Sequence, residues 1–177
     1  MGVGTLLRKW KNCVAKKQTA EAALALVTSF ITPVLTQPEE VIVEYNSKPD
    51  SMYFIQGGSC VVHRRSLFKR TDRPIALLKC NDHFGEISMI FDCPTFARVM
   101  SSKFSLLGRL NKHNFARISR AFPGFRRVIK DEVLLYRSKW KKRLEDALRQ
   151  TPYFSSLGAY LMSKILYSCR LVQFDEG

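Results

Sequence analysis

The sequence predicts a mainly β fold, an antiparallel β-roll or jelly roll with flanking α-helices and a helix pair after the last strand. Between Val34 and Leu110, short apolar or alternating runs are separated by turn residues, a pattern typical of antiparallel rolls and sandwiches. Before and after this stretch, apolar residues recur every three or four positions, as on one face of an α-helix. At 177 residues, the chain is long enough for one well-buried domain with attached helices.

The apolar runs predict six strands. Turns between them are marked by residues 46–50, Gly57-Gly58, residues 70–74 and Asn81-Asp82. The predicted strands are Val41–Tyr45, Met52–Gln56, Ser59–His63, Ile75–Leu78, Arg98–Met100 and Phe104–Leu110.

Helices are predicted on both sides of the roll. Residues 5–30 carry helical spacing in two segments, and Pro33 is expected to close this region. Asn111 is expected to cap a helix that runs to Ala121, and Pro123-Gly124 to interrupt it. One continuous helix is predicted after this interruption, because apolar residues at helical spacing form one stripe along an otherwise basic segment. The residues of this stripe are Phe125, Ile129, Val133, Tyr136, Trp140, Leu144 and Leu148.

The positive charge of the chain is large and uneven. The formal net charge is +14, and the stretch from Arg109 to Arg149 holds thirteen Lys and Arg against four acidic residues. Such asymmetry indicates an acidic partner, which is a nucleic acid, an anionic membrane surface or an acidic protein surface. The alternative is a solvated helix face whose counter-charges lie elsewhere in a longer protein.

Several kinds of site are not predicted. The five cysteines are odd in number and lack metal-type spacing, which favours a reducing, intracellular compartment over a disulfide framework. His63, His83 and His113 lack the spacing of metal ligands, and no Ser/His/Asp, Cys/His or paired-carboxylate arrangement indicates catalysis. No apolar run reaches the roughly 18–20 residues that span a bilayer. We therefore expect a non-enzymatic intracellular module with no metal and no resident cofactor.

Three segments, in order, resemble cyclic-nucleotide-binding domains. Residues 52–58, MYFIQGG, look like the strand and turn that the family writes MYFI-x-x-G. Residues 81–89, NDHFGEISM, resemble G-D-x-F-G-E-[IL]-[AS]-L, and residues 94–99, PTFARV, lie where P-R-[TA]-A-x-V ends the family's phosphate-binding cassette. The likeness covers roughly residues 24–149.

The resemblance implies a pocket for cyclic AMP or cyclic GMP as a regulatory ligand. Gly85 would let the backbone approach the phosphate closely, and Glu86 would accept a hydrogen bond from the ribose 2′-hydroxyl. Two aromatic residues after the roll would cover the purine, as the equivalent helix does in the family. The implied binding residues are Gly85, Glu86, Ile87, Ser88, Thr95, Phe96 and Ala97, with Tyr136 and Trp140 as the purine lid.

A structural role is the alternative for each of these side chains. Glu86 would then satisfy turn amides, Phe96 would belong to the core, and Tyr136 and Trp140 would be packing residues of the apolar stripe.

Thr95 departs from the family pattern, since the family has an arginine at this position. A guanidinium forms charge-assisted bonds with a phosphate that are worth about 1.5–3 kcal/mol each, whereas a threonine hydroxyl brings no charge. Arg98 lies three residues further along a strand and is expected to point to the opposite face. The alternatives are Arg64 and Arg65, which would have to reach in from another strand.

The resemblance divides the chain into four segments. Residues 1–23 form a basic helical lead-in, 24–128 the roll with its first C-terminal helix, and 129–150 a long basic amphipathic helix. Residues 151–177 are similar to the opening of a second such domain, as in the tandem domains of regulatory subunits of cyclic-AMP-dependent protein kinase.

The sequence leaves three functions open. The first is a cyclic-nucleotide-gated regulatory module of a larger signalling protein, with a weakened phosphate site. The second is a degenerate fold that serves as a protein-docking scaffold through its basic C-terminal helix. The third, a nucleic-acid-binding regulator, is not favoured, because the residues after the long helix resemble another roll rather than a helix-turn-helix.

Overall fold

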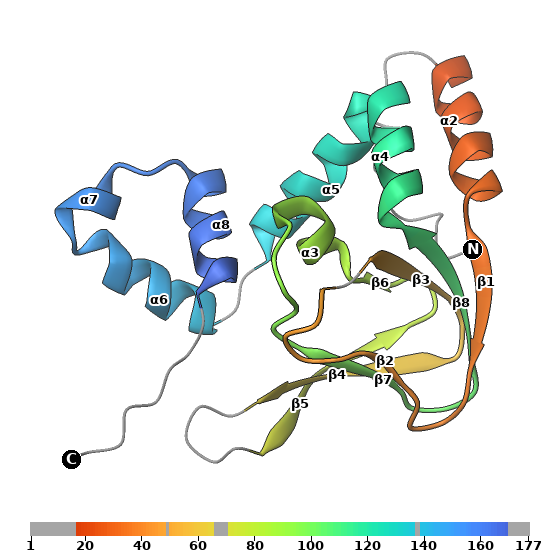
Figure 1. Ribbon diagram of the computed structural model, residues 1–177, viewed down its shortest axis with the longest axis horizontal. Helices are drawn as coiled ribbons and strands as arrows, with labels where there is room; N and C mark the ends of the chain where they lie inside the picture. Colours follow the sequence, from red (N-terminus) through yellow and green to blue (C-terminus); the bar gives the residue numbers. More distant parts are fainter. Residues whose placement is uncertain (1–16, 49, 66–70, 137–138, 170–177) are drawn as a thin grey trace.

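The predicted antiparallel roll is confirmed. The computed structural model of the chain describes residues 17–48, 50–65, 71–136 and 139–169, and in these ranges eight strands form two four-stranded sheets (Figure 1). The strands are β1 (Thr32–Thr36), β2 (Val41–Val43), β3 (Ser51–Gly57), β4 (Ser59–Arg65), β5 (Asp72–Lys79), β6 (His83–Phe84), β7 (Arg98–Ser101) and β8 (Ser105–Asn111). One sheet has the order β1-β8-β3-β6 and the other β2-β7-β4-β5, and each pairing is antiparallel.

Strands β1 and β6 were not predicted from the sequence. Pro33, which we expected to close the helical region, lies inside β1. Proline is tolerated there because β1 is the edge strand of its sheet, where a missing N–H need not cost a ladder bond. Strand β6 has only two residues, too few to show a period in the sequence, and its pairing with β3 defines it.

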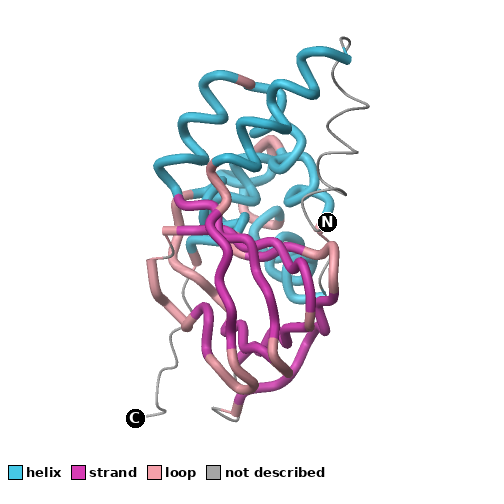
Figure 2. Tube along the Cα trace, turned by 90° about the vertical axis from the view of Figure 1, so that its right-hand side faces the viewer, coloured by secondary structure: helices cyan, strands magenta, loops and turns pink. Residues whose placement is uncertain are grey.

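The helices gather at one end of the roll (Figure 2). They are α2 (Lys17–Ser29), α3 (Glu86–Phe91), α4 (Lys112–Ala121), α5 (Pro123–Leu135), α6 (Lys139–Arg149), α7 (Pro152–Ser155) and α8 (Ala159–Ser168). Asn111 caps α4 as predicted, and its side chain accepts a hydrogen bond from the backbone N–H of Asn114 at 2.8 Å. The predicted helix over residues 5–16 lies outside the described ranges. Within them, every helix is too short or too polar to cross a lipid bilayer.

The single long helix predicted through residues 125–148 is wrong. Helix α5 ends at Leu135, Tyr136 has an extended backbone (φ −61°, ψ 112°), and α6 begins at Lys139. The apolar period continues across the break because both halves pack their apolar faces against other helices. Helix α5 packs mainly against α3 and α4, α6 packs mainly against α7, and α8 contacts both. Spacing alone therefore could not reveal the break.

Two apolar clusters hold the roll and the helices together, and β3 contributes to both. Met52 and Phe54 face the helices, while Ile55 and Tyr53 face the space between the sheets, as strand alternation requires. Helix α3 adds Met89, Ile90 and Phe91 to the helix-side cluster. The short helix is thus fixed in position by its apolar face, and its first residue, Glu86, is carried into the interior.

Gly58 is required by the turn between β3 and β4. Its φ is +86°, and a Cβ there would lie 2.2 Å from Ser105 Oγ and 2.6 Å from the Phe104 carbonyl oxygen. We expect Gly58→Ala to lower the free energy of unfolding by at least about 1–2 kcal/mol, the usual cost of a left-handed non-glycine residue. Gly57→Ala is the matched control, because a Cβ at Gly57 meets nothing within 4 Å. Urea unfolding of both variants measures the difference, and equal losses would contradict this account of the turn.

Candidate functional site

A cavity of about 270 Å³ lies between the strands of the β2-β7-β4-β5 sheet and residues 84–97, which we call the cassette. Eight of the nine residues that the resemblance implied line this cavity: Gly85, Glu86, Ile87, Ser88, Thr95, Phe96, Ala97 and Tyr136. The side chain of the ninth, Trp140, lies outside the described part of the chain. The remaining lining residues are Val43, Val62, Ala76, Leu78, His83, Phe84 and Val99.

Gly85 makes the turn from β6 into α3. Its φ is +89°, and a Cβ would lie 2.8 Å from the carbonyl oxygen of Ser51. Only glycine adopts this conformation readily. The close approach is made to the backbone of β3, so the fold itself requires Gly85.

Glu86 is the buried carboxyl of the cavity, with 4% of its surface exposed. Burial raises its pKa, and the charge of His83 and a hydrogen bond with the Tyr136 hydroxyl act in the opposite direction. Among the described residues, Glu86 Oε2 and His83 Nε2 have no hydrogen-bond partner. Both residues line the cavity, and both of these atoms are buried within the protein.

The Thr95 hydroxyl is hydrogen-bonded to the loop that follows β2. It donates to the carbonyl oxygen of Glu44 and accepts a hydrogen bond from the Ser47 backbone N–H at 3.1 Å. These contacts fix the loop after β2 to the end of the cassette. In this arrangement the hydroxyl proton lies in a hydrogen bond within the fold.

Arg98 points away from the cavity, as we expected. Its guanidinium bonds to Glu44 at 2.9 Å and to Asp72 at 3.0 Å. None of the fifteen described residues that line the cavity is Lys or Arg. The lining is thus apolar apart from Glu86, His83, Ser88, Thr95 and Tyr136, and no guanidinium or ammonium group lines it.

Phe96 is covered by an aromatic residue from far along the chain. Tyr167 of α8 stacks on Phe96 with ring centroids 5.3 Å apart, and it lies at the same distance from Phe91 of α3. Burial raises the pKa of Tyr167 to about 12. Local spacing carries no sign of this contact, whereas alternation along β4 and β7 would have identified Val62 and Val99 as lining residues.

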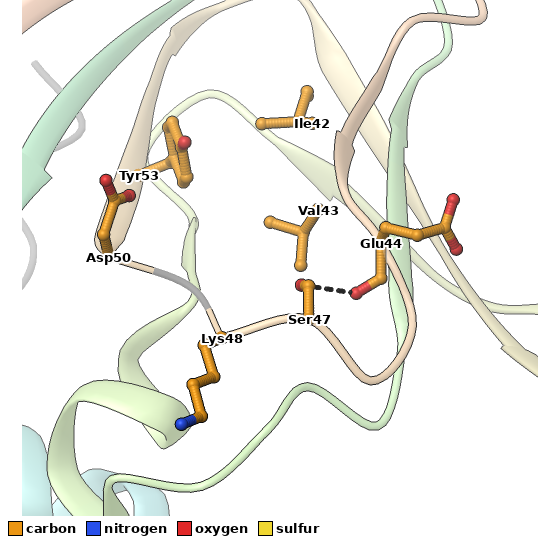
Figure 3. A pocket seen from close by; sticks show the side chains of 7 residues that line it. All are labelled: Ile42, Val43, Glu44, Ser47, Lys48, Asp50 and Tyr53. Carbon is orange, nitrogen blue, oxygen red and sulfur yellow. Dashed lines mark hydrogen bonds between the residues drawn. The ribbon is translucent and has the colours of Figure 1, made fainter.

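A second hollow, of about 280 Å³, lies beside the cavity, and Val43 lines both. Figure 3 shows Ile42, Val43 and Tyr53 around it, with Lys48 and Asp50 at its edge and the hydrogen bond from Ser47 Oγ to the Glu44 carbonyl oxygen at 2.8 Å. Its rim is the same loop that Thr95 holds. No group of three or more His, Cys, Asp or Glu in the described ranges is arranged to hold a metal ion.

Residues 34–121 match the family model of the cyclic nucleotide-binding domain. The chain belongs to this family. Among solved structures, it is similar to the Catabolite Activator Protein of Thermus thermophilus (18% identity, TM-score 0.59, covering 80% of this chain and 61% of that one). It is also similar to cAMP-bound PfPKA-R (141-441) (18% identity, TM-score 0.55, 92% and 52%).

A third similar structure is the regulatory subunit of a cAMP-independent protein kinase A from Trypanosoma cruzi bound to guanosine (16% identity, TM-score 0.55, 86% and 49%). At these identities the likeness shows the fold alone, and the chain spans about half to three fifths of the length of these structures. No curated protein matches the chain.

Because the pKa of Glu86 is raised, the free energy of unfolding depends on pH. Between its ordinary pKa of 4.5 and the raised value, the folded state binds the proton that the unfolded chain has lost, so the free energy of unfolding falls as pH rises. Glu86→Gln keeps the shape and the hydrogen-bond acceptor but removes the charge. We expect this variant to be more stable than the parent at pH 7, with a difference that shrinks as the pH falls toward 4.5.

Urea unfolding across this pH range measures the effect, and Glu44→Gln is the control of opposite sign. A hydrogen bond from Arg98 lowers the pKa of Glu44, so its charged form contributes stability at pH 7 that is lost in acid. We expect Glu44→Gln to be less stable than the parent at pH 7. A stability difference between Glu86→Gln and the parent that stays constant with pH would contradict the burial argument.

Proposed function

We propose that this chain is the non-catalytic, ligand-sensing domain of a larger intracellular signalling protein, and that its ligand is a purine nucleoside or cyclic nucleotide held chiefly through the ribose. The observation that carries the proposal is the Glu86 carboxyl, which is buried in the cavity wall with Oε2 unpartnered in the described chain. A ribose hydroxyl is a donor of the size and polarity that such an oxygen accepts.

The position of Tyr136 suggests how binding would be transmitted. Tyr136 follows the last residue of α5, and its hydroxyl bonds to the same carboxyl that the ribose would use. A ribose at Glu86 would therefore share one carboxyl with the Tyr136 hydroxyl, and we expect the bound state to favour a different position of the end of α5. Helices α6 to α8 follow directly, so a neighbouring domain would sense the change. Such coupling needs only that the ligand bind one arrangement more tightly than the other.

The phosphate should add little to the affinity of the parent chain. No described lining residue is a cation, and the Thr95 hydroxyl is engaged with Glu44. The guanosine complex of the Trypanosoma cruzi subunit supports this proposal, because it is a case in which this fold holds a nucleoside that has no phosphate.

The scaffold function is the second candidate. The bonds of Thr95 to the loop and of Tyr136 to Glu86 favour it, since they give these polar groups partners without any ligand. The partner would be an acidic protein or an anionic membrane surface that meets exposed Arg117, Arg120 and Arg127 on α4 and α5. Binding to nucleic acid is not proposed, since net charge is its only support in this chain.

Thr95→Arg tests the cassette geometry. We expect its affinity for cyclic AMP and cyclic GMP to rise about 10- to 100-fold over the parent, because a guanidinium restores charge-assisted bonds to the phosphate. Affinity for adenosine and guanosine should not rise. Isothermal titration measures all four compounds.

Thr95→Val is the matched control, because it loses the same loop bonds without adding a cation. We expect no gain for cyclic nucleotides in this variant. If neither the parent nor Thr95→Arg binds any of the four compounds at millimolar concentration, the ligand-sensing function is wrong and the scaffold is favoured.

A further inference from the structure

Strand β5 forms an open edge of the roll. Within the described ranges, the order β2-β7-β4-β5 leaves one side of β5 without a neighbouring strand, and Figure 1 shows β5 at the far end of the roll from α4. Its second half pairs with β4 without a register shift, from Ala76 opposite Val62 to Lys79 opposite Ser59. A regular edge of this kind presents unpaired backbone N–H and C=O groups to solvent.

Apolar side chains accompany this open backbone. Ile75 and Leu77 are 55% and 53% exposed, whereas Ala76 and Leu78 line the cavity. Leu77 also ends an apolar row that crosses the outer face of all four strands in register; its other members are Val61, Met100 and Val41. A strand added beside β5 would continue this row and cover Leu77. Because proteins normally protect such edges, the exposed row indicates a partner.

The charges on β5 indicate the chemistry of that partner. Arg73 and Lys79 lie toward the two ends of the strand, both are exposed, and neither forms an ion pair with another described residue. The neighbouring carboxylates are engaged within the fold. Asp72 binds the Arg98 guanidinium at 3.0 Å, and Asp82 accepts a hydrogen bond from the Lys79 backbone N–H at 2.8 Å. The edge is therefore apolar in its middle and positive toward its ends.

A second copy of the chain does not suit this edge. In the antiparallel register that sets Ile75 of one copy opposite Leu77 of the other, Arg73 of each copy would lie opposite Lys79 of the other. Like charges directly opposite each other on paired strands are destabilising. The charges instead complement a strand that carries Asp or Glu on both sides of its apolar residues.

We propose that the open edge of β5 binds an extended, acidic segment of a partner protein, which adds as a further strand to the β2-β7-β4-β5 sheet. Main-chain hydrogen bonds supply affinity in this mode of recognition, and the side chains at alternate positions supply specificity. This docking surface is separate from the basic face of α4 and α5, and it does not depend on a ligand in the cavity.

The experiment is a fluorescence anisotropy titration of the full chain with a labelled peptide in which valine and threonine alternate between glutamates at both ends. One control peptide has lysines in place of the glutamates, and another has proline in place of the central valine. We expect the lysine peptide to bind at least about 5-fold more weakly than the glutamate peptide, because two attractive charge pairs become repulsive. The proline peptide should also bind more weakly, since proline lacks the N–H that an added strand donates.

Reversing the charges of the edge should exchange the preference. We expect the double variant Arg73→Glu with Lys79→Glu to bind the lysine peptide more tightly than the glutamate peptide, a gain that only a folded chain can show. The double variant Arg120→Glu with Arg127→Glu is the matched control. It makes the same change in net charge at exposed positions of α4 and α5, and it should keep the preference of the parent.

Leu77→Thr tests the apolar contact and should weaken the glutamate peptide about 2- to 5-fold. Equal binding of the glutamate and lysine peptides by the parent, or no binding of the glutamate peptide at millimolar concentration, overturns the proposal. A preference lost in the Arg120 and Arg127 variant but kept in the Arg73 and Lys79 variant also overturns it. Self-association of the parent that Leu77→Thr abolishes would identify a second copy as the occupant and exclude the acidic segment. None of these outcomes alters the expected binding of nucleosides, so the ligand-sensing function is tested separately.

Discussion

The burial of one carboxyl is the constraint on which the rest of this cavity depends. Glu86 enters the interior because the apolar face of α3 is fixed in the helix-side cluster and because Gly85 lets the chain turn sharply against β3. A buried carboxylate is costly unless hydrogen bonds or opposite charges satisfy it. Here the Tyr136 hydroxyl provides part of that compensation, from the residue at which α5 ends. The position of a helix end is thereby linked to the state of one side chain.

The Arg98 guanidinium links neighbouring strands beside the cavity. Arg98 joins β7 to the end of β2 through Glu44 and to β5 through Asp72, and its guanidinium lies 5.4 Å from the ring centroid of Tyr45. Thr95 then fixes the loop that follows β2. In this way the first loop and the cassette are held by contacts within the protein. These contacts hold the wall of the cavity from within the protein.

The sequence was sufficient for the fold and for most of the candidate cavity, because both depend on local patterns. Alternation identified six strands, and Gly85 and Glu86 could be placed from the segment that surrounds them. The break at Tyr136 could not be foreseen, since the apolar period runs through it and only the extended backbone of Tyr136 marks it. The hydrogen bonds of the Thr95 hydroxyl could not be foreseen either, because their partners lie in an earlier loop, with Glu44 51 residues before Thr95 in the sequence. Contacts between distant segments, such as Tyr167 on Phe96, leave no trace in local spacing.

The stacking of Tyr167 on Phe96 has a consequence for biosynthesis. Helix α8 is the last helix in the described ranges, whereas the cassette lies in the middle of the chain. As the polypeptide leaves the ribosome, the two sheets and α3 can pair while α8 is still unmade, and Phe96 and Phe91 then lack the Tyr167 ring. The nascent roll therefore has a less covered aromatic surface until α8 is translated, which is the interval in which a chaperone would meet it.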